Sequence, residues 1–227
     1  MVSYTNQNKK QMQKFINLHT HTFSDNSDYL EIVNQYPSNF DDKIPYFSIG
    51  IHPWKINQNE IENELKIIEH KLQFINCLAL GECGIDKRIE IPIDLQLEVF
   101  EQQILLAKKY NKPLIIHCVA AFSELISIKI ADKISVPIII HGFSKNFIVA
   151  NQLIDNGFYL SFGKYLMQNT DLQNVFQSVP IDKIFLETDS STYNIEDIYK
   201  TAAKIKDLDL LSLQNQIKEN FNRVFKL

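Results

Sequence analysis

Short apolar runs alternate with longer amphipathic segments along almost the whole chain, and this alternation restricts the fold more than any other feature. The apolar runs are rich in Ile, Val, Leu and Phe, as expected of parallel strands buried on both faces. Seven of them occur, at 14–19, 44–52, 75–82, 112–117, 136–141, 158–163 and 183–189. Apolar residues three or four positions apart predict helices at 61–73, 94–110, 121–132, 145–157, 170–179 and 210–225. Strands that alternate with helices predict right-handed βαβ units around a parallel sheet.

An eighth run, 29–37, is compatible with either a strand or a short helix, and Val33 together with Pro37 favours the strand. The link before it is shorter than the dozen or more residues that a parallel crossover normally needs. We therefore expect an α/β fold of the TIM (β/α)8 barrel type with a shortened first βα unit. Because no linker, low-complexity tract or internal repeat interrupts the pattern, residues 1–227 are expected to form a single domain, in which 1–13 is a polar N-terminal extension.

The composition excludes several classes of protein. With 227 residues, 45% of them hydrophobic, the chain can bury one sizeable core. Its formal net charge of −4 gives no general attraction to phosphate backbones, so nucleic-acid binding would depend on a local patch or a metal site. No run of eighteen apolar residues exists, and the first fourteen residues lack the apolar middle of a signal peptide. Three cysteines without zinc-ribbon spacing favour a reducing compartment, so we expect a cytoplasmic protein without membrane contact.

Histidines and acids gather at the C-terminal ends of the predicted strands. Five of the six histidines lie at such ends or just beyond them, and two runs end at or close to a carboxylate. The full set is His19, His21, His52, His117, His141, Glu82 and Asp189. In a TIM barrel these ends converge on one face of the molecule, where such enzymes build their sites. Imidazoles and carboxylates that converge in this way suit a divalent transition metal such as Zn, Mn or Ni.

Each element taken alone has a plainer explanation. The HTH sequence at 19–21 puts both imidazoles on one side of a strand, but such a pair by itself is weak evidence for a metal. His117 and His141 each follow an apolar run, where a solitary histidine is more often a hydrogen-bonded core residue. Glu82 and Asp189 would be costly to bury without a cation or hydrogen-bond partners. The set as a whole is therefore hard to explain as packing.

Six motifs occur in the order found in the TatD-like metal-dependent hydrolases. They are HTH (19–21), GIHPW (50–54), GECGID (81–86), IIHCVA (115–120), IIIHGFS (138–144) and LETD (186–189), and ENFNRVF (219–225) also resembles the end of that family. The resemblance runs from Phe15 nearly to Leu227. The family is one of the amidohydrolase-like TIM barrels, and many of its members are described as metal-dependent deoxyribonucleases.

The resemblance implies a two-metal site. His19, His21 and Asp189 would hold the first divalent ion, His117 and His141 the second, and Glu82 would bridge the two. The ions could be Zn, Mn, Mg, Ni or Co. Asp189 and Glu82 are the expected catalytic residues, with Asp189 orienting or deprotonating the attacking water.

Substrate contacts are expected from the remaining side chains that follow strand ends. These are His52, Trp54, Lys87, Arg88 and Lys145, with Lys164 as a further cation. His52 is expected to contact substrate or support a ligand rather than bind metal itself. Trp54 would either stack on a base or sugar or cover the barrel rim.

The sequence also departs from the family pattern. Asn17 replaces the usual acid before the HxH motif, which removes a charge beside the first metal. Val119 replaces an Arg that could clamp a phosphate. A polar SSTY follows the last motif, and the segment between HTH and GIHP is short. These changes leave the metal ligands in place and put the DNA substrate in question.

The leading prediction is a metal-dependent hydrolase, expected to be a monomer, that acts as a two-metal phosphodiesterase on DNA or on another phosphate ester. One alternative is a hydrolase of a small-molecule ester, lactone or amide. Another is a metal-binding scaffold without catalytic activity. The stretch HTHTFSDNS also resembles the first motif of the PHP phosphoesterases, but the later motifs fit TatD-like proteins better.

Overall fold

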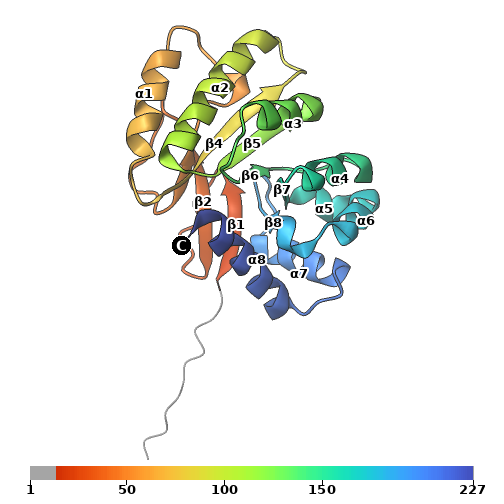
Figure 1. Ribbon diagram of the computed structural model, residues 1–227. Helices are drawn as coiled ribbons and strands as arrows, with labels where there is room; N and C mark the ends of the chain where they lie inside the picture. Colours follow the sequence, from red (N-terminus) through yellow and green to blue (C-terminus); the bar gives the residue numbers. More distant parts are fainter. Residues whose placement is uncertain (1–13, 227) are drawn as a thin grey trace, which may run out of the picture.

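The computed structural model describes residues 14–226. Within this range, eight parallel strands form one sheet in which neighbours follow chain order (Figure 1). They are β1 (Phe15–Thr20), β2 (Tyr29–Gln35), β3 (Phe47–Ile49), β4 (Cys77–Asp86), β5 (Leu114–Val119), β6 (Ile138–Ile140), β7 (Tyr159–Phe162) and β8 (Ile184–Leu186). Helices pack around this nearly closed barrel, which confirms the predicted TIM-barrel class. The predicted N-terminal extension, 1–13, lies outside the described residues.

The first two links of the barrel carry no helix within this part of the chain. Residues 21–28 join β1 to β2 as a loop, so the shortened first unit is confirmed and the eighth run is a strand. The link 36–46 between β2 and β3 is also a loop, as the absence of a predicted helix between the runs 29–37 and 44–52 implies. No helix that the structure describes follows β1 or β2 directly, and β1 is instead contacted by the C-terminal helices α7 and α8.

Most predicted helices are found close to their expected bounds. They are α1 (Ile61–Lys71), α2 (Ile93–Tyr110), α3 (Phe122–Ala131), α4 (Phe147–Asp155), α6 (Thr170–Ser178) and α8 (Leu210–Phe225). The described chain also contains α5 (Lys164–Gln168), α7 (Ile195–Ile205) and two short 3-10 helices, η1 (Pro53–Lys55) and η2 (Ile181–Lys183), none of which was predicted. None of the helices in residues 14–226 has the length and apolar character needed to cross a membrane.

Helix α7 had a readable signal that the sequence analysis missed. The Asn194 side chain caps its first turn by accepting a hydrogen bond from the backbone N–H of Glu196. Its buried residues, including Ile195, Ile198 and Tyr199, recur at the spacing of one helix face.

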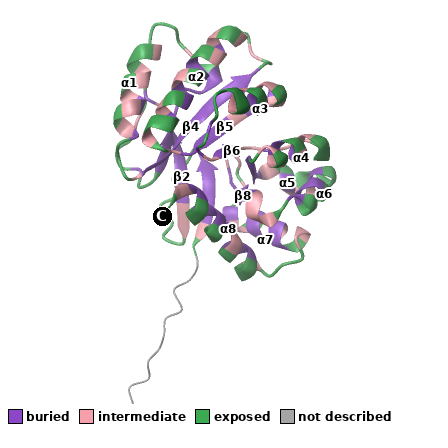
Figure 2. Cartoon of the chain, in the orientation of Figure 1, coloured by how far each residue is buried: buried purple, intermediate pink, exposed green. Residues whose placement is uncertain are grey.

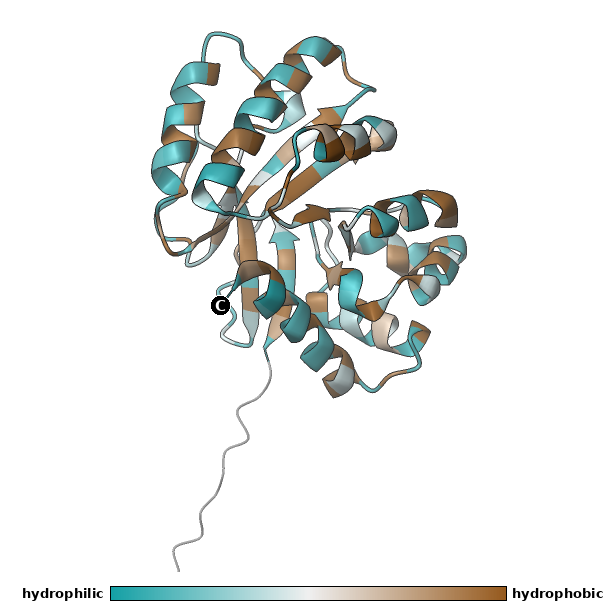
Figure 3. Cartoon of the chain, viewed as in Figure 1, coloured by the Kyte–Doolittle hydropathy of each residue, from teal (hydrophilic) through white to brown (hydrophobic). Residues whose placement is uncertain are grey.

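The core lies in the strands and in the helix faces that cover them. Figure 2 shows the central strands as largely buried, and Figure 3 shows apolar residues concentrated in the strands while the outer helix faces are more polar. All ten residues of β4 are buried. Such burial on both faces is what a parallel sheet covered by helices requires, and it explains the continuous apolar runs.

The barrel closes at a narrow seam between β1 and β8. Among the described residues these strands pair through one isolated bridge, Thr20 with Asp189. The backbone N–H of Asp189 donates to the carbonyl of His19 at 2.9 Å, and the N–H of His21 donates to the carbonyl of Asp189 at 3.3 Å. Asp189 has a φ of 55°, a left-handed conformation that Asp tolerates better than most side chains. The seam thus brings Asp189 beside the HTH motif.

Candidate metal centre

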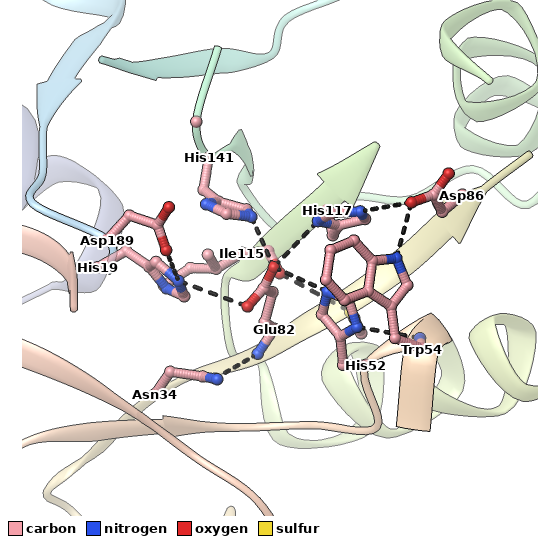
Figure 4. A network of polar contacts seen from close by, with 12 residues as sticks. His19, Asn34, His52, Trp54, Glu82, Asp86, Ile115, His117, His141 and Asp189 are labelled. Atoms are coloured by element: carbon pink, nitrogen blue, oxygen red, sulfur yellow. Dashed lines mark hydrogen bonds and ion pairs between the residues drawn. The ribbon is translucent and has the colours of Figure 1, made fainter. Parts of the chain in front are cut away.

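Glu82 lies in the middle of the polar cluster that the strand ends form (Figure 4). Its side chain is buried, and its backbone N–H donates to the Asn34 side-chain oxygen at 2.7 Å. A Cβ on Gly81 would lie 2.4 Å from the carbonyl oxygen of Ile115, and one on Gly84 would lie 2.1 Å from that of His117. Glycines on both sides of Glu82 therefore let β4 approach β5 closely and bring the carboxylate to the histidines.

One oxygen of Glu82 faces the HTH motif. Glu82 Oε2 lies 3.5 Å from His19 Nε2 and 3.6 Å from His21 Nε2. Asp189 Oδ1 lies 3.3 Å from His21 Nε2 and 3.9 Å from His19 Nε2. Ligand atoms about 2.1 Å from one tetrahedral cation are roughly 3.4 Å apart. Among the described residues, the ligand atoms of His19, His21 and Glu82 all lie within 4.8 Å of one another, as do those of His19, His141 and Asp189, so each trio could hold an ion.

The other oxygen of Glu82 faces three more imidazoles. Glu82 Oε1 lies 2.7 Å from His141 Nε2, 3.1 Å from His117 Nδ1 and 3.1 Å from His52 Nε2. The six predicted ligands therefore meet at one place, divided between the two oxygens of a single carboxylate. His52, which was expected to contact substrate or support a ligand, lies equally close to Glu82.

The hydrogen on each imidazole distinguishes His52 from His117. The backbone N–H of Trp54 donates to His52 Nδ1 at 3.0 Å, so the neutral His52 ring carries its hydrogen at Nε2 and donates it to Glu82. His117 places Nε2 3.3 Å from Asp86 Oδ2, which can accept a hydrogen there and leave Nδ1 free as a ligand atom. In this geometry His52 donates a hydrogen bond to Glu82, and His52, Glu82 and His117 also form a group whose ligand atoms all lie within 4.8 Å of one another.

His19 shows that this cluster suits a cation. It is 0% exposed, and neither of its ring nitrogens has a hydrogen-bond partner within the described part of the chain. A buried polar nitrogen without a partner costs about 1–3 kcal/mol. A divalent ion at Nε2 would remove this cost, and imidazole nitrogens with carboxylate oxygens are the donors that Zn and its neighbours bind.

Two further carboxylates support the histidines, and the sequence analysis missed both. Glu187, at the end of β8, is fully buried; its Oε1 accepts the backbone N–H of Gly142 at 2.7 Å and lies 3.4 Å from His141 Nδ1. Asp86 ends β4 and supports His117 as described, and its Oδ2 also accepts the Trp54 indole N–H at 2.7 Å. Carboxylates in such positions fix the orientation and the tautomer of a metal-binding imidazole. Both residues stand inside motifs quoted above, GECGID and LETD.

The cluster controls the protonation of its own members. Burial raises the pKa of the Glu82 carboxyl, but the His141 charge and the contacts with the surrounding imidazoles outweigh this effect, and the net pKa lies well below the ordinary value. Burial likewise raises the pKa of Asp189, and the hydrogen bond from His21 with nearby positive charge lowers it overall. Burial lowers the pKa of His52, so this ring stays neutral. Both carboxylates are therefore charged and able to bind a cation at neutral pH.

A cavity of about 560 Å³ opens above the cluster. Cations and aromatic rings share its wall, among them Lys55, Arg88, Lys145, Lys164, Tyr36, Trp54 and Tyr165. Lys164 Nζ lies 3.4 Å from Asp189 Oδ2, and Trp54 is 62% exposed. The wall can therefore offer positive charge and a stacking surface next to the carboxylates.

Most of the residues predicted to contact substrate line this cavity. His52, Trp54, Arg88 and Lys145 line it, as does Val119. Lys87 is not among the lining residues, because its ammonium pairs with Glu124 on α3. Lys55 and Tyr36 line the cavity and were not predicted.

Comparisons with known proteins agree with this geometry. The family model described as "TatD related DNase" matches residues 3–226. The chain is 27% identical to the uncharacterized metal-dependent hydrolase YcfH of Escherichia coli K12, over 80% of this chain and 74% of that protein. It is 28% identical to the uncharacterized metal-dependent hydrolase YabD of Bacillus subtilis 168, over 80% and 78%. The crystal structure of the TatD homologue YjjV from E. coli K12 superposes with a TM-score of 0.82 at 18% identity, covering 95% of this chain and 99% of that one, and this likeness shows the shared fold.

Proposed function

Because this chain belongs to the TatD-related DNase family, we propose that it is a metal-dependent hydrolase that cleaves phosphodiester bonds, with DNA as its substrate. The observation that carries the proposal is that the two carboxylate oxygens of Glu82 contact different histidines. Oε2 faces His19 and His21, and Oε1 faces His117 and His141. A single carboxylate with imidazoles on both sides is the arrangement that a two-metal site needs.

The proposed ligand sets combine these contacts with the order of motifs that the chain shares with its family. His19, His21, Asp189 and Glu82 Oε2 would hold one divalent ion, and His117, His141 and Glu82 Oε1 the other. Two divalent cations held in this way neutralise phosphate oxygens and make water acidic near neutral pH. Zn, Mn, Mg, Ni and Co are all candidates, because the donor set alone does not select among them.

Side chains beside the proposed metal ions would orient the water and accept its proton. The Oδ1 atom of Asp189 faces His21, and its Oδ2 atom lies 3.4 Å from Lys164 Nζ. In the proposed reaction, Oδ2 would orient the attacking water and accept its proton. Lys164 lies where it would also attract a phosphate oxygen. Ser190 Oγ lies 3.4 Å from the same carboxylate oxygen and has no base of its own, so no serine nucleophile is proposed.

Substrate binding would depend on the cavity wall. Arg88, Lys145 and Lys55 provide local positive charge on a chain whose formal net charge is −4. The exposed ring of Trp54 is held by its N–H bond to Asp86 and offers a face on which a base can stack. Positive charge with aromatic surface is the combination that binds single-stranded nucleic acid.

Val119 favours a second candidate, the hydrolysis of a smaller ester. The apolar Val119 lines the cavity at the position where an Arg could have clamped a phosphate. A substrate without a nucleic-acid backbone would need fewer cations. A panel of generic phosphodiester, carboxylic ester and lactone substrates separates the two candidates by their rates.

The proposal is tested by incubating the protein, loaded separately with Mn, Co, Zn or Mg, with single-stranded DNA labelled at its 5′ end. We expect progressive shortening from the 3′ end that a chelator stops. The matched control is Lys66→Ala, because this lysine is exposed on α1 and pairs with Glu62 far from the cavity. Folded, metal-loaded protein that turns over none of the DNA would contradict the nuclease proposal.

A further inference from the structure

Asn17 bonds across the seam of the barrel, three positions before Thr20, which bridges to Asp189 in the segment after β8. Its side-chain oxygen accepts the backbone N–H of Thr188 at 3.0 Å. Its side-chain nitrogen donates to Thr188 Oγ1 at 2.9 Å. Thr188 immediately precedes Asp189, so this pair of bonds fixes the backbone that carries the proposed ligand. Asn17 is 1% exposed, and water therefore does not compete for these bonds.

Glu31 completes the arrangement from the neighbouring strand. It is the register partner of Asn17 in the β1–β2 pair and is only 7% exposed. Its Oε1 lies 3.5 Å from the Asn17 side-chain nitrogen. Its Oε2 accepts the backbone N–H of Ser24 at 2.9 Å and the Ser24 hydroxyl at 2.7 Å. Ser24 thus holds one oxygen of the Glu31 carboxylate, and the other oxygen faces the Asn17 side-chain amide.

We propose that Asn17 and Glu31 are a matched amide–carboxylate pair that positions Asp189 to bind metal, an inference that rests on the metal centre proposed above. The Thr188 N–H requires an acceptor, which turns the amide oxygen towards it. The amide nitrogen must then find acceptors, and Thr188 Oγ1 and Glu31 Oε1 are the ones it meets. Asn17 is therefore not merely a lost charge beside the first metal, as the sequence suggested.

The pair predicts what a change at either position does. A carboxylate in place of the Asn17 amide would still accept from Thr188, but its second oxygen would face the Glu31 carboxylate in a buried setting. Two like charges at this distance repel, and the seam would move to separate them. Replacing Glu31 by Gln at the same time removes the conflict, because a Gln amide can accept from Ser24 with its oxygen and donate with its nitrogen to the new carboxylate. The donor and acceptor are simply exchanged.

The test compares Asn17→Asp, Glu31→Gln and the double variant with wild type in the full-length protein. Mn²⁺ alone is titrated into metal-free protein by calorimetry, and the Tm of the metal-free protein is measured in parallel. Asn17→Asp should weaken Mn²⁺ binding on the order of tenfold, as changes to groups that orient metal ligands do. The double variant should recover to within about threefold of wild type, because contacting residues do not act additively. Asn63→Asp, the same change at an exposed position of α1, is the matched control.

Each outcome decides the inference. Recovery in the double variant supports it, including the case in which Asn17→Asp alone fails to fold and the double variant folds. Single variants that bind Mn²⁺ like wild type, or lower Tm values without a change in affinity, overturn it and leave Asn17 a purely structural residue. A double variant that binds no better than the weaker single variant, or does not fold, also overturns it. Wild type that binds no Mn²⁺ overturns the proposed metal centre together with the inference.

Discussion

Glu82 is the residue on which the proposed centre depends, because both halves of the ligand set share it. Glu82→Gln keeps the shape of the side chain and removes its charge. We predict that bound metal falls from two ions to one or none per chain, and that hydrolysis falls by at least about 100-fold, since even supporting groups of a metal site are worth 10–100-fold. Elemental analysis and rate measurements on one preparation test this. Glu98→Gln, at an exposed position of α2, should change neither quantity.

His52 and His117 make a second residue-scale prediction, because their imidazoles carry the hydrogen on different atoms. His52 donates to Glu82, whereas His117 offers Nδ1 as a ligand. His52→Ala should keep two bound ions and weaken their affinity by about 10–100-fold, as expected for a supporting hydrogen bond. His117→Ala should lose the second ion. Two variants with the same metal content and affinity would contradict the assignment of the two roles.

At the scale of elements, the C-terminal end of α6 depends on Lys206, the residue that caps the C-terminus of α7. Lys206 Nζ donates to the carbonyl oxygens of Gln177 and Val179, at 3.0 and 2.5 Å. Burial lowers the pKa of Lys206 from 10.5 to about 8. The unfolded chain therefore binds more protons than the folded one between these pH values, and the contribution of Lys206 to stability must rise with pH in this window.

Lys206→Met removes this titration and keeps most of the side chain. The Tm of wild type, relative to the Tm of the variant, should be constant below about pH 8 and rise from there towards pH 10. Comparing the two proteins cancels the titration of all other groups. A difference that stays flat or falls over this range would show that burial does not lower the pKa of Lys206.

The strands could be predicted from sequence because a parallel strand that is buried on both faces forms a short, continuous run of apolar residues. All eight strands are therefore found where the apolar runs stand. The same observation predicted that seven histidines and acids meet at one face, and the resemblance to the family selected six of them as ligands. The helix α7 was missed although its Asn194 cap and its buried face can be read from the sequence, whereas the helix-free link between β2 and β3 agrees with the short spacing of the apolar runs.

The direction in which each side chain points could not be predicted from sequence, and this limited the prediction of the site. Lys87 follows a strand end as Arg88 does, yet it turns to Glu124 on α3, while Lys55 reaches the cavity from η1. Glu187 and Asp86 support histidines from other strands, and such partners depend on the barrel having closed. Asn17 and Glu31 are neighbours only through the β1–β2 register, which strand prediction alone does not provide.

At the scale of the whole molecule, the metal centre joins both ends of the barrel sheet. Its proposed ligands come from β1, β4, β5 and the segments after β6 and β8, so bound metal should stabilise the entire fold. At a free metal concentration 100 times Kd, binding adds about 2.7 kcal/mol. For a chain of this length this corresponds to a Tm increase of roughly 5–10 °C.

Removal of metal with a chelator should reverse that increase, and addition of Mn²⁺ should restore it. Scanning calorimetry of chelated and reloaded protein measures both directions. Glu82→Gln should show a much smaller Mn²⁺-dependent shift, because the carboxylate charge that both ion sites share is gone. A Tm that does not respond to metal in wild type would mean that no tight site connects these strands.

The most direct test of the two-metal centre is a crystal structure of the protein soaked in Mn²⁺, with the metal located by anomalous scattering. We predict two peaks about 3.5–4 Å apart on either side of the Glu82 carboxylate. One peak should lie among His19, His21 and Asp189, and the other between His117 and His141. A single peak, or two peaks of which neither touches Glu82, would contradict the account.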